Sequence, residues 1–265
     1  MRHRTHAGRI LICSFIISVV PSYGTVKMQL INGRPVVDMV YVNGHGPFRF
    51  LVDTGANVNL IAGSLARKIG MEMTFKTDFA SVTRQSVAPG STGNEISLDS
   101  ARAFGQEFLL TDFDASQDAL ADIQGLLGQA FLSRFDYVLD LKRRQLTFGA
   151  QNWNGTRSRF RMINGRPSVS TSLGELVLDS GAPALVVTGV KADIASGRTA
   201  EMRTAAGSDQ VALCTRRLVI EGRKIWQGDA VVIPHRLEPG VDGLLPLRFF
   251  KTVYVSNSGG FLVLD

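Results

Sequence analysis

The chain has 265 residues, which is enough for one large or two moderate domains with an ample hydrophobic core. Residues 1–24 carry three arginines and no acidic residue, so the formal net charge of +6 leaves the rest of the chain with 26 basic and 23 acidic residues. This excess is too small and too dispersed to indicate nucleic-acid binding. Because Cys13 falls in the N-terminal apolar run, only Cys214 remains beyond it, and we expect no internal disulfide.

The N-terminus has the layout of a secretory signal. Residues 1–9 are basic, residues 10–20 are apolar, and residues 21–24 bring small side chains at cleavage spacing. We predict a signal peptide over residues 1–24, cleaved near Gly24, and therefore an exported protein, periplasmic or secreted. The apolar run is too short to cross a bilayer comfortably, so no stable membrane insertion is expected after cleavage. A buried N-terminal strand or helix is the alternative interpretation.

From residue 25 onward the pattern is that of a β-protein, with β-branched runs separated by Asn-Gly and Gly-Pro turns. A short helix is expected at residues 63–70, where a glycine ends the segment. The polar stretch 73–97 is either a flap over a site or a plain surface hairpin. The other expected elements are strands at 36–42, 48–52, 98–104 and 108–113, a helix at 129–135, and a closing hairpin of 137–141 and 145–148.

The second half of the chain repeats the first. Residues 163–167 copy the Ile-Asn-Gly-Arg-Pro of residues 31–35 without change, and residues 241–250 echo residues 123–132. In each half, one loop with an isolated aspartate, at residue 53 or 179, lies between these two markers. The three features keep the same order in both halves, at offsets of 132, 126 and 118 residues. We therefore predict two homologous lobes, residues 25–149 and 150–265, with a linker at 149–158.

Each half carries an isolated aspartate at the end of an apolar strand, followed by a hydroxyl residue, a glycine and an alanine. A carboxylate in an apolar setting is costly unless it has a task. Glycine permits the tight turn that presents the carboxylate, and the hydroxyl can hydrogen-bond to the partner half. Two such loops can bring two carboxylates within about 3 Å, where they share one proton and can activate a water. The residues concerned are Asp53, Thr54, Gly55, Asp179, Ser180 and Gly181.

These motifs resemble those of the aspartic peptidases, in both their pepsin-like and retropepsin-like forms. The resemblance covers nearly all of the chain after the signal, and it includes a hydrophobic-hydrophobic-glycine segment that would pack beneath each Asp loop. It implies an all-β fold of two β-barrel lobes related by a pseudo-dyad, with short helices, Asp53 and Asp179 as the catalytic pair, and an extended polypeptide bound between the lobes. It implies no cofactor and no metal, and because both lobes are in one chain, a monomer is sufficient. The support segments are Leu126, Leu127 and Gly128 in the first half, and Leu244 and Leu245 in the second.

Two departures from the pattern motivate an alternative. Pro246 stands where the first half has Gly128, so the second support segment is expected to turn differently. The candidate flap, residues 74–95, lacks the tyrosine that is typical of pepsin-like flaps. The alternative is a catalytically silent peptide-binding or sensory module with the same fold.

Other kinds of active site lack a starting motif. The sequence contains no Gly-x-Ser-x-Gly, no His-Glu-x-x-His and no Cys-x-x-Cys, so serine-hydrolase and zinc chemistry are not indicated. His45 and His235 flank turn residues, which favours a solvated role over catalysis. Cys214 lies in a strand-like segment and is interpreted as a small buried residue.

Overall fold

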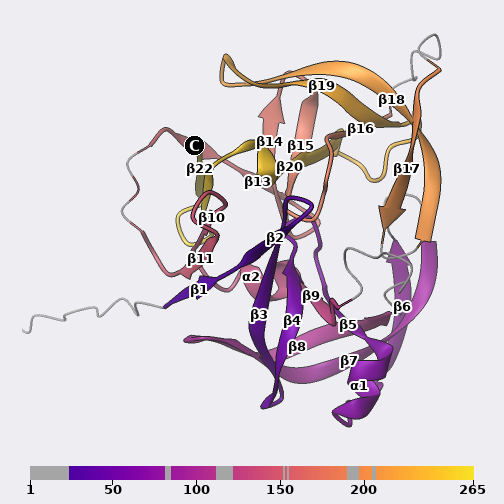
Figure 1. Ribbon diagram of the computed structural model, residues 1–265, viewed down its shortest axis with the longest axis vertical. Coiled ribbons are helices and arrows are strands. Elements are labelled where there is room, and N and C mark those ends of the chain that lie inside the picture. Colours follow the sequence, from indigo (N-terminus) through magenta and orange to yellow (C-terminus); the bar gives the residue numbers. More distant parts are fainter. Residues whose placement is uncertain are drawn as a thin grey trace, which may run out of the picture.

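The computed structural model describes residues 24–80, 85–111, 122–151, 153, 155–189, 197–204 and 207–265. Residues 1–23 of the predicted signal peptide and residues 81–84 of the candidate flap lie outside these ranges. In the described part of the chain, no helix is long and apolar enough to cross a membrane. The predicted all-β, two-lobed fold is confirmed, with two large sheets and one smaller sheet (Figure 1).

The first lobe is built on one eight-stranded sheet. Its strands, in spatial order, are β2 (Gln29–Ile31), β3 (Arg34–Val42), β4 (His45–Val52), β9 (Gly125–Leu127), β5 (Asn59–Ala62), β8 (Ala101–Thr111), β7 (Gln85–Leu98) and β6 (Phe75–Ala80). Strand β9 pairs in parallel with β4 and antiparallel with β5, while β5 pairs in parallel with β8.

The second lobe repeats this sheet strand for strand. Its order is β13 (Arg161–Ile163), β14 (Arg166–Thr171), β15 (Gly174–Asp179), β20 (Gly243–Pro246), β16 (Val186–Thr188), β19 (Arg223–Ile233), β18 (Gly207–Ile220) and β17 (Thr199–Thr204). The parallel pairs β15–β20 and β16–β19 and the antiparallel pair β16–β20 match those of the first lobe. In Figure 1 the second lobe, in orange, lies above the first, in purple.

The third sheet is shared by the two lobes and contains the closing hairpin expected at residues 137–148. Its order is β1 (Thr25–Lys27), β11 (Gln145–Phe148), β10 (Tyr137–Asp140), β21 (Thr252–Ser256), β22 (Phe261–Leu264) and β12 (Arg157–Arg159). Strands β10 and β21 pair antiparallel at the centre, so each hairpin joins its counterpart from the other half. The proposed lobe boundary at residues 149 and 150 falls between β11 and β12.

The short helices follow the expected pattern, with corrections at their ends. Helix α1 (Gly63–Lys68) is followed by Gly70 at a φ of 67°, a left-handed conformation that suits glycine. Helix α2 (Gln129–Leu132) is shorter than expected, and η2 (Leu247–Phe249) is a 3₁₀ turn at the corresponding place. The strands expected at 98–104 and 108–113 are wrong, because the chain turns at Asp99 and then forms the single strand β8.

The strands that lead to the two aspartates are buried on both faces. Phe50 and Val52 of β4 belong to the main apolar core, whereas Leu51 between them belongs to a second cluster inside the first lobe. Leu178 and Val177 of β15 divide in the same way between the main core and a cluster of the second lobe. Strands covered on both faces are continuously apolar. This explains why the apolar run before each aspartate continues up to the end of the strand.

Candidate active site

Each aspartate sits where a central strand ends, next to a parallel partner. The N–H of Asp53 donates to the carbonyl of Leu127 at 2.9 Å, directly after β4. Asp179 is the last residue of β15 and lies opposite Pro246 of β20. The two loops therefore leave their sheets at the same point, and the sequence-predicted pair occupies equivalent positions in the two lobes.

The two loops interlock through the hydroxyl residues that follow the aspartates. The Thr54 hydroxyl donates to the carbonyl of Leu178 at 2.8 Å and accepts the N–H of Ser180 at 3.0 Å. The Ser180 hydroxyl donates to the carbonyl of Val52 at 2.7 Å and accepts the N–H of Thr54 at 3.0 Å. Both side chains are buried. Four reciprocal hydrogen bonds thus fix one loop against the other.

The carboxyl groups of Asp53 and Asp179 are hydrogen-bonded to each other. Asp53 also accepts the N–H of Gly55 at 2.9 Å, and Asp179 accepts the N–H of Ala182 at 2.8 Å. A Cβ atom on Gly55 would lie 2.3 Å from Cγ of Asp179, and one on Gly181 would lie 2.6 Å from Oδ2 of Asp53. Glycine is therefore needed in each loop because the opposite carboxyl group occupies the space of a side chain.

The environment raises the pKa of both carboxyl groups above the usual 3.8. For Asp53 the main cause is burial, while the N–H of Gly55 and the hydrogen bond with Asp179 act in the opposite direction. For Asp179 burial is again the main cause, and the nearby charge of Asp53 raises its pKa further, to well above 3.8. Because two buried carboxyl groups this close cannot both ionise at little cost, the pair holds one proton between them over a wide pH range.

The support segments lie beneath the two loops, as central strands of the sheets. Leu127 and Leu245 are fully buried in the main core, whereas Leu126 and Leu244 point to the separate clusters of their own lobes. A Cβ on Gly128 would lie 2.0 Å from the carbonyl oxygen of Val58, so only glycine fits there.

Pro246 replaces Gly128 in the second lobe without leaving a buried polar group unpaired. In the first lobe, the N–H of Gly128 donates to the side chain of Asn59 at 3.0 Å. The residue 126 positions after Asn59 is Leu185, and Pro246 has no N–H to satisfy. The backbone ψ angle is −167° at Gly128 and 125° at Pro246, so the second segment does turn differently, as its sequence indicates.

Sequence reasoning missed two arginines near the pair. Arg34 and Arg166 interact electrostatically with both carboxyl groups, and Arg166 donates to the carbonyl of Gly55 at 3.3 Å. Both belong to the repeated Ile-Asn-Gly-Arg-Pro segment, where the Asn-Gly turn alone explains the hairpin. One feature of the sequence could have identified these arginines. Both copies of the repeated segment have a positively charged residue where a buried strand begins.

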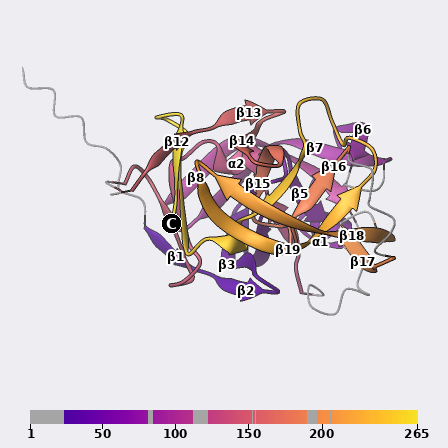
Figure 2. The ribbon, with the colours of Figure 1, turned by 90° about the horizontal axis from the view of Figure 1, so that it is seen from above.

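A second hairpin and a buried glutamine were also missed. Strands β17 and β18 pair as β6 and β7 do, so the candidate flap of the first lobe has a counterpart in the second. Both hairpins lie at the end of the molecule opposite the shared sheet (Figures 1 and 2). Gln129 donates from its side chain to the carbonyl of Thr54 at 3.0 Å and thereby ties α2 to the first loop.

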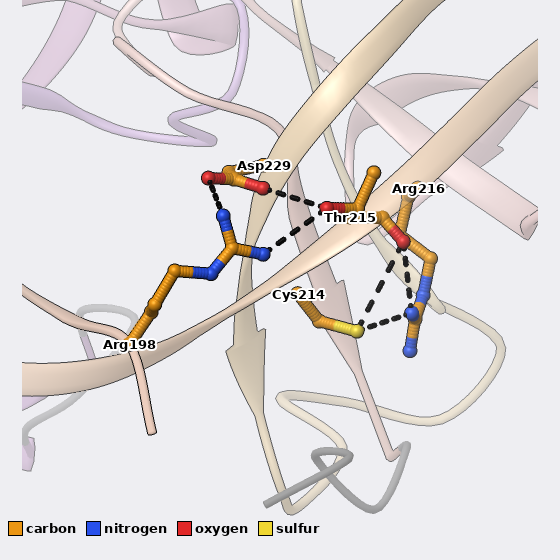
Figure 3. Close-up of polar contacts among 5 residues, drawn as sticks. All are labelled: Arg198, Cys214, Thr215, Arg216 and Asp229. Atoms are coloured by element: carbon orange, nitrogen blue, oxygen red, sulfur yellow. Dashed lines mark hydrogen bonds and ion pairs between the residues drawn. The ribbon is translucent and has the colours of Figure 1, made fainter. Parts of the chain in front are cut away.

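Cys214 lies on β18 and takes no part in the two Asp loops. It is buried, and its sulfur accepts a hydrogen bond from the guanidinium of Arg216 (Figure 3). Beside it, Arg198 pairs with Asp229 and also donates to the Thr215 hydroxyl. These contacts hold the β18–β19 hairpin to the start of β17.

The remaining candidates of the sequence lie at the surface. His45 and His235 are both exposed. In the described ranges, no group of three or more His, Cys, Asp or Glu side chains is arranged to hold a metal ion.

Comparisons with known proteins agree with this fold. A family model described as aspartyl protease matches residues 22–131, which is somewhat less than half of the chain and spans the first Asp loop and its support segment. The comparison with curated proteins gives no match. Among solved structures, the aspartic proteinase from Irpex lacteus matches over 91% of this chain and 97% of its own, with 14% sequence identity and a TM-score of 0.56. The first lobe thus matches the aspartyl protease family, and the whole chain has the two-lobed fold of that proteinase.

Proposed function

We propose that this protein is an aspartic endopeptidase that hydrolyses peptide bonds of an extended polypeptide with a water activated by Asp53 and Asp179. The observation that carries the proposal is the pair of mutually hydrogen-bonded carboxyl groups on two interlocked loops. Two buried carboxyl groups with raised pKa values have no evident structural purpose, because the hydroxyls of Thr54 and Ser180 already join the loops. The family match of the first lobe supports the same chemistry.

The electrostatics of the pair suggest which carboxyl group plays which part. Asp53, in its ionised form, takes a proton from the water while the water oxygen attacks the carbonyl carbon of the peptide bond. Asp179, protonated, gives its proton to the carbonyl oxygen, which yields a tetrahedral diol. In the second step the proton on Asp53 passes to the peptide nitrogen, the C–N bond breaks, and Asp179 regains a proton from the diol. The products are a carboxylic acid and an amine, and the pair returns to its starting protonation state.

The protein would act as a monomer, because both halves of the pair are in one chain. The four loop-to-loop hydrogen bonds are all made within it. Export through the predicted signal at residues 1–24 remains part of this proposal. N-terminal sequencing of the protein recovered from outside the cytoplasm checks that part, and an intact Met1 there would contradict it.

A statine-containing peptide separates the enzyme from a silent binding module. Statine carries a hydroxyl in place of the tetrahedral centre, so it binds an intact pair of carboxyl groups in both cases. We expect the purified protein to cleave a denatured protein substrate, and one equivalent of bound statine peptide to abolish that cleavage. Tight binding of the statine peptide without cleavage of any peptide in a library would instead favour the silent module.

A further inference from the structure

The two arginines near the catalytic pair have different surroundings, although their sequence segments are identical. Arg166 forms an ion pair with Glu238, which lies before β20, and Glu238 also accepts from Asn164 in the turn before β14. With the hydrogen bond to Gly55, the charge of Arg166 is neutralised inside the protein. This end of the site therefore presents no unpaired charge to a substrate.

Arg34, the counterpart of Arg166, has no carboxylate partner other than the catalytic pair among the described residues. The side-chain hydrogen bonds and ion pairs of the described chain include none from its guanidinium, whereas the Nε atoms of Arg34 and Arg166 are both buried without a partner. Among the described residues, the charge of Arg34 is therefore balanced only by the catalytic pair.

A second cation reinforces this asymmetry. Arg248 donates to the carbonyl of Pro183 at 2.9 Å, and its side chain lies against Gly33, where a Cβ would be 3.3 Å away. The residue 118 positions earlier is Ala130, so the opposite end of the site has no such arginine. Arg248 therefore lies where the second Asp loop meets the turn that precedes Arg34.

An open cavity of about 550 Å³ continues from this point. Its described lining includes three exposed cations and no acidic side chain, and it brings together both lobes through Asn32, Gly33, Pro183, Arg248, Lys142 and Lys251. Arg34, Arg248 and the two lysines of the cavity thus lie at the same end of the site, and the described lining sets no acidic side chain against them. A positively charged site with low-dielectric walls concentrates anionic ligands.

We propose that the Arg34 end of the site binds a carboxylate of the substrate, so that the preferred substrates are polypeptides with an acidic group close to the scissile bond on that side. This inference rests on the proposed function and names its substrate class. Arg34 provides the inner contact, and Arg248 with the cavity beyond it extends the preference outward along the polypeptide. The carboxylate comes either from an Asp or Glu side chain or from the C-terminus of the substrate.

The test uses peptides that bind but are not cleaved, with a hydroxyethylene group in place of the scissile bond. Glu is exchanged for Gln at each position on both sides of that bond, and a parallel pair compares a free C-terminus with its amide. Dissociation constants are measured by calorimetry on the full-length mature protein. We expect the carboxylate form to bind roughly 10-fold more tightly at one or two positions on one side only, with a preference that weakens as salt is added.

Substitutions then assign the preference to residues. Arg34→Gln and, independently, Arg248→Gln should reduce the preference for the acidic peptide to less than about threefold. Arg248 is exposed, so its variant is informative even if Arg34→Gln does not fold. Arg67→Gln, on the exposed side of α1, is the matched control and should keep the full preference.

The outcomes separate this inference from the proposed function. Equal binding of the acidic and amide peptides at every position overturns the acidic preference, and so does a full preference in both arginine variants. Because binding does not need turnover, an acidic preference in a protein that cleaves nothing contradicts only the proposed catalysis. Cleavage of neutral and acidic peptides at equal rates, together with equal binding, contradicts only the acidic preference.

Discussion

The Thr54→Val variant should lose both stability and activity, because it removes one hydroxyl from the interlocked loops while keeping the shape of the side chain. In the native protein this hydroxyl donates to the carbonyl of Leu178 and accepts the N–H of Ser180. Valine leaves both backbone groups in place, and the side chain of Thr54 is fully buried, so water cannot replace the lost partner.

The size of the loss follows from the number of groups left unpaired. An unsatisfied buried donor or acceptor costs about 1–3 kcal/mol, so two of them lower the free energy of unfolding by about 2–6 kcal/mol. A domain of this kind has about 5–15 kcal/mol in total. A shift of the carboxyl groups by about 1 Å lowers kcat by roughly 100-fold, because the reacting groups lose their alignment.

Denaturant unfolding and steady-state kinetics of the same preparations measure both effects. Thr54→Ser keeps the hydroxyl and loses only a methyl group, so it is the matched control and should lose about 1 kcal/mol. Ser180→Ala makes the mirror change in the other loop and should cost a similar amount. A Thr54→Val protein that unfolds within about 0.5 kcal/mol of the native protein and retains its kcat would refute the interlocking account.

Three further results are expected. The pH–rate profile should be bell-shaped, because activity needs one carboxyl group of the pair ionised and the other protonated. The raised pKa values, and Ala56 and Ala182 in place of hydroxyl residues that could donate to the pair, favour an optimum that is not strongly acidic, so a maximum near pH 2 would contradict this. Asp179→Asn should be inactive yet melt at a higher temperature than the native protein near pH 7. In the native protein the folded state binds more protons than the unfolded state between pH 3.8 and the raised pKa of Asp179, so the stability of the native protein falls as the pH rises through that window. Asparagine does not ionise, so the variant avoids this loss. An unchanged melting temperature would contradict the predicted direction of this stability change. Gly128→Ala should lose about 3 kcal/mol or more in urea unfolding, since the new Cβ meets the carbonyl of Val58, and native-like unfolding would show that the loop can move away.

Much of the fold could be predicted from local chemistry and the internal repeat. The apolar runs before Asp53 and Asp179 are continuous because both faces of β4 and β15 are buried, and that pattern is visible in the sequence. The equal order of strands in the two lobes follows from the repeat. The shared sheet could not be predicted, because pairing of β10 with β21 joins residues far apart in the chain and leaves no periodic signal.

The site was predictable as a list of groups but not as a distribution of charge. Both arginines stand in identical segments, so their sequences alone give no reason to treat them differently. The difference arises from Glu238, in the loop before β20, and from Arg248 in η2, both of the second lobe. The sequence also gives no sign of why Leu185 can stand where the first lobe has Asn59. Asn59 accepts the N–H of Gly128, and Pro246, the counterpart of Gly128, has no N–H to be accepted.

The most direct test of the proposed catalysis compares the rates at which the native protein, Asp53→Asn and Asp179→Asn cleave a denatured protein substrate. Asparagine keeps the size of each side chain but can neither take up nor release the proton that the reaction moves. Circular dichroism of the same preparations verifies that each variant is folded. We expect each folded variant to lose cleavage by at least roughly 1,000-fold, since the two carboxyl groups act as a unit. Cleavage by either variant at the native rate would contradict the proposed catalysis.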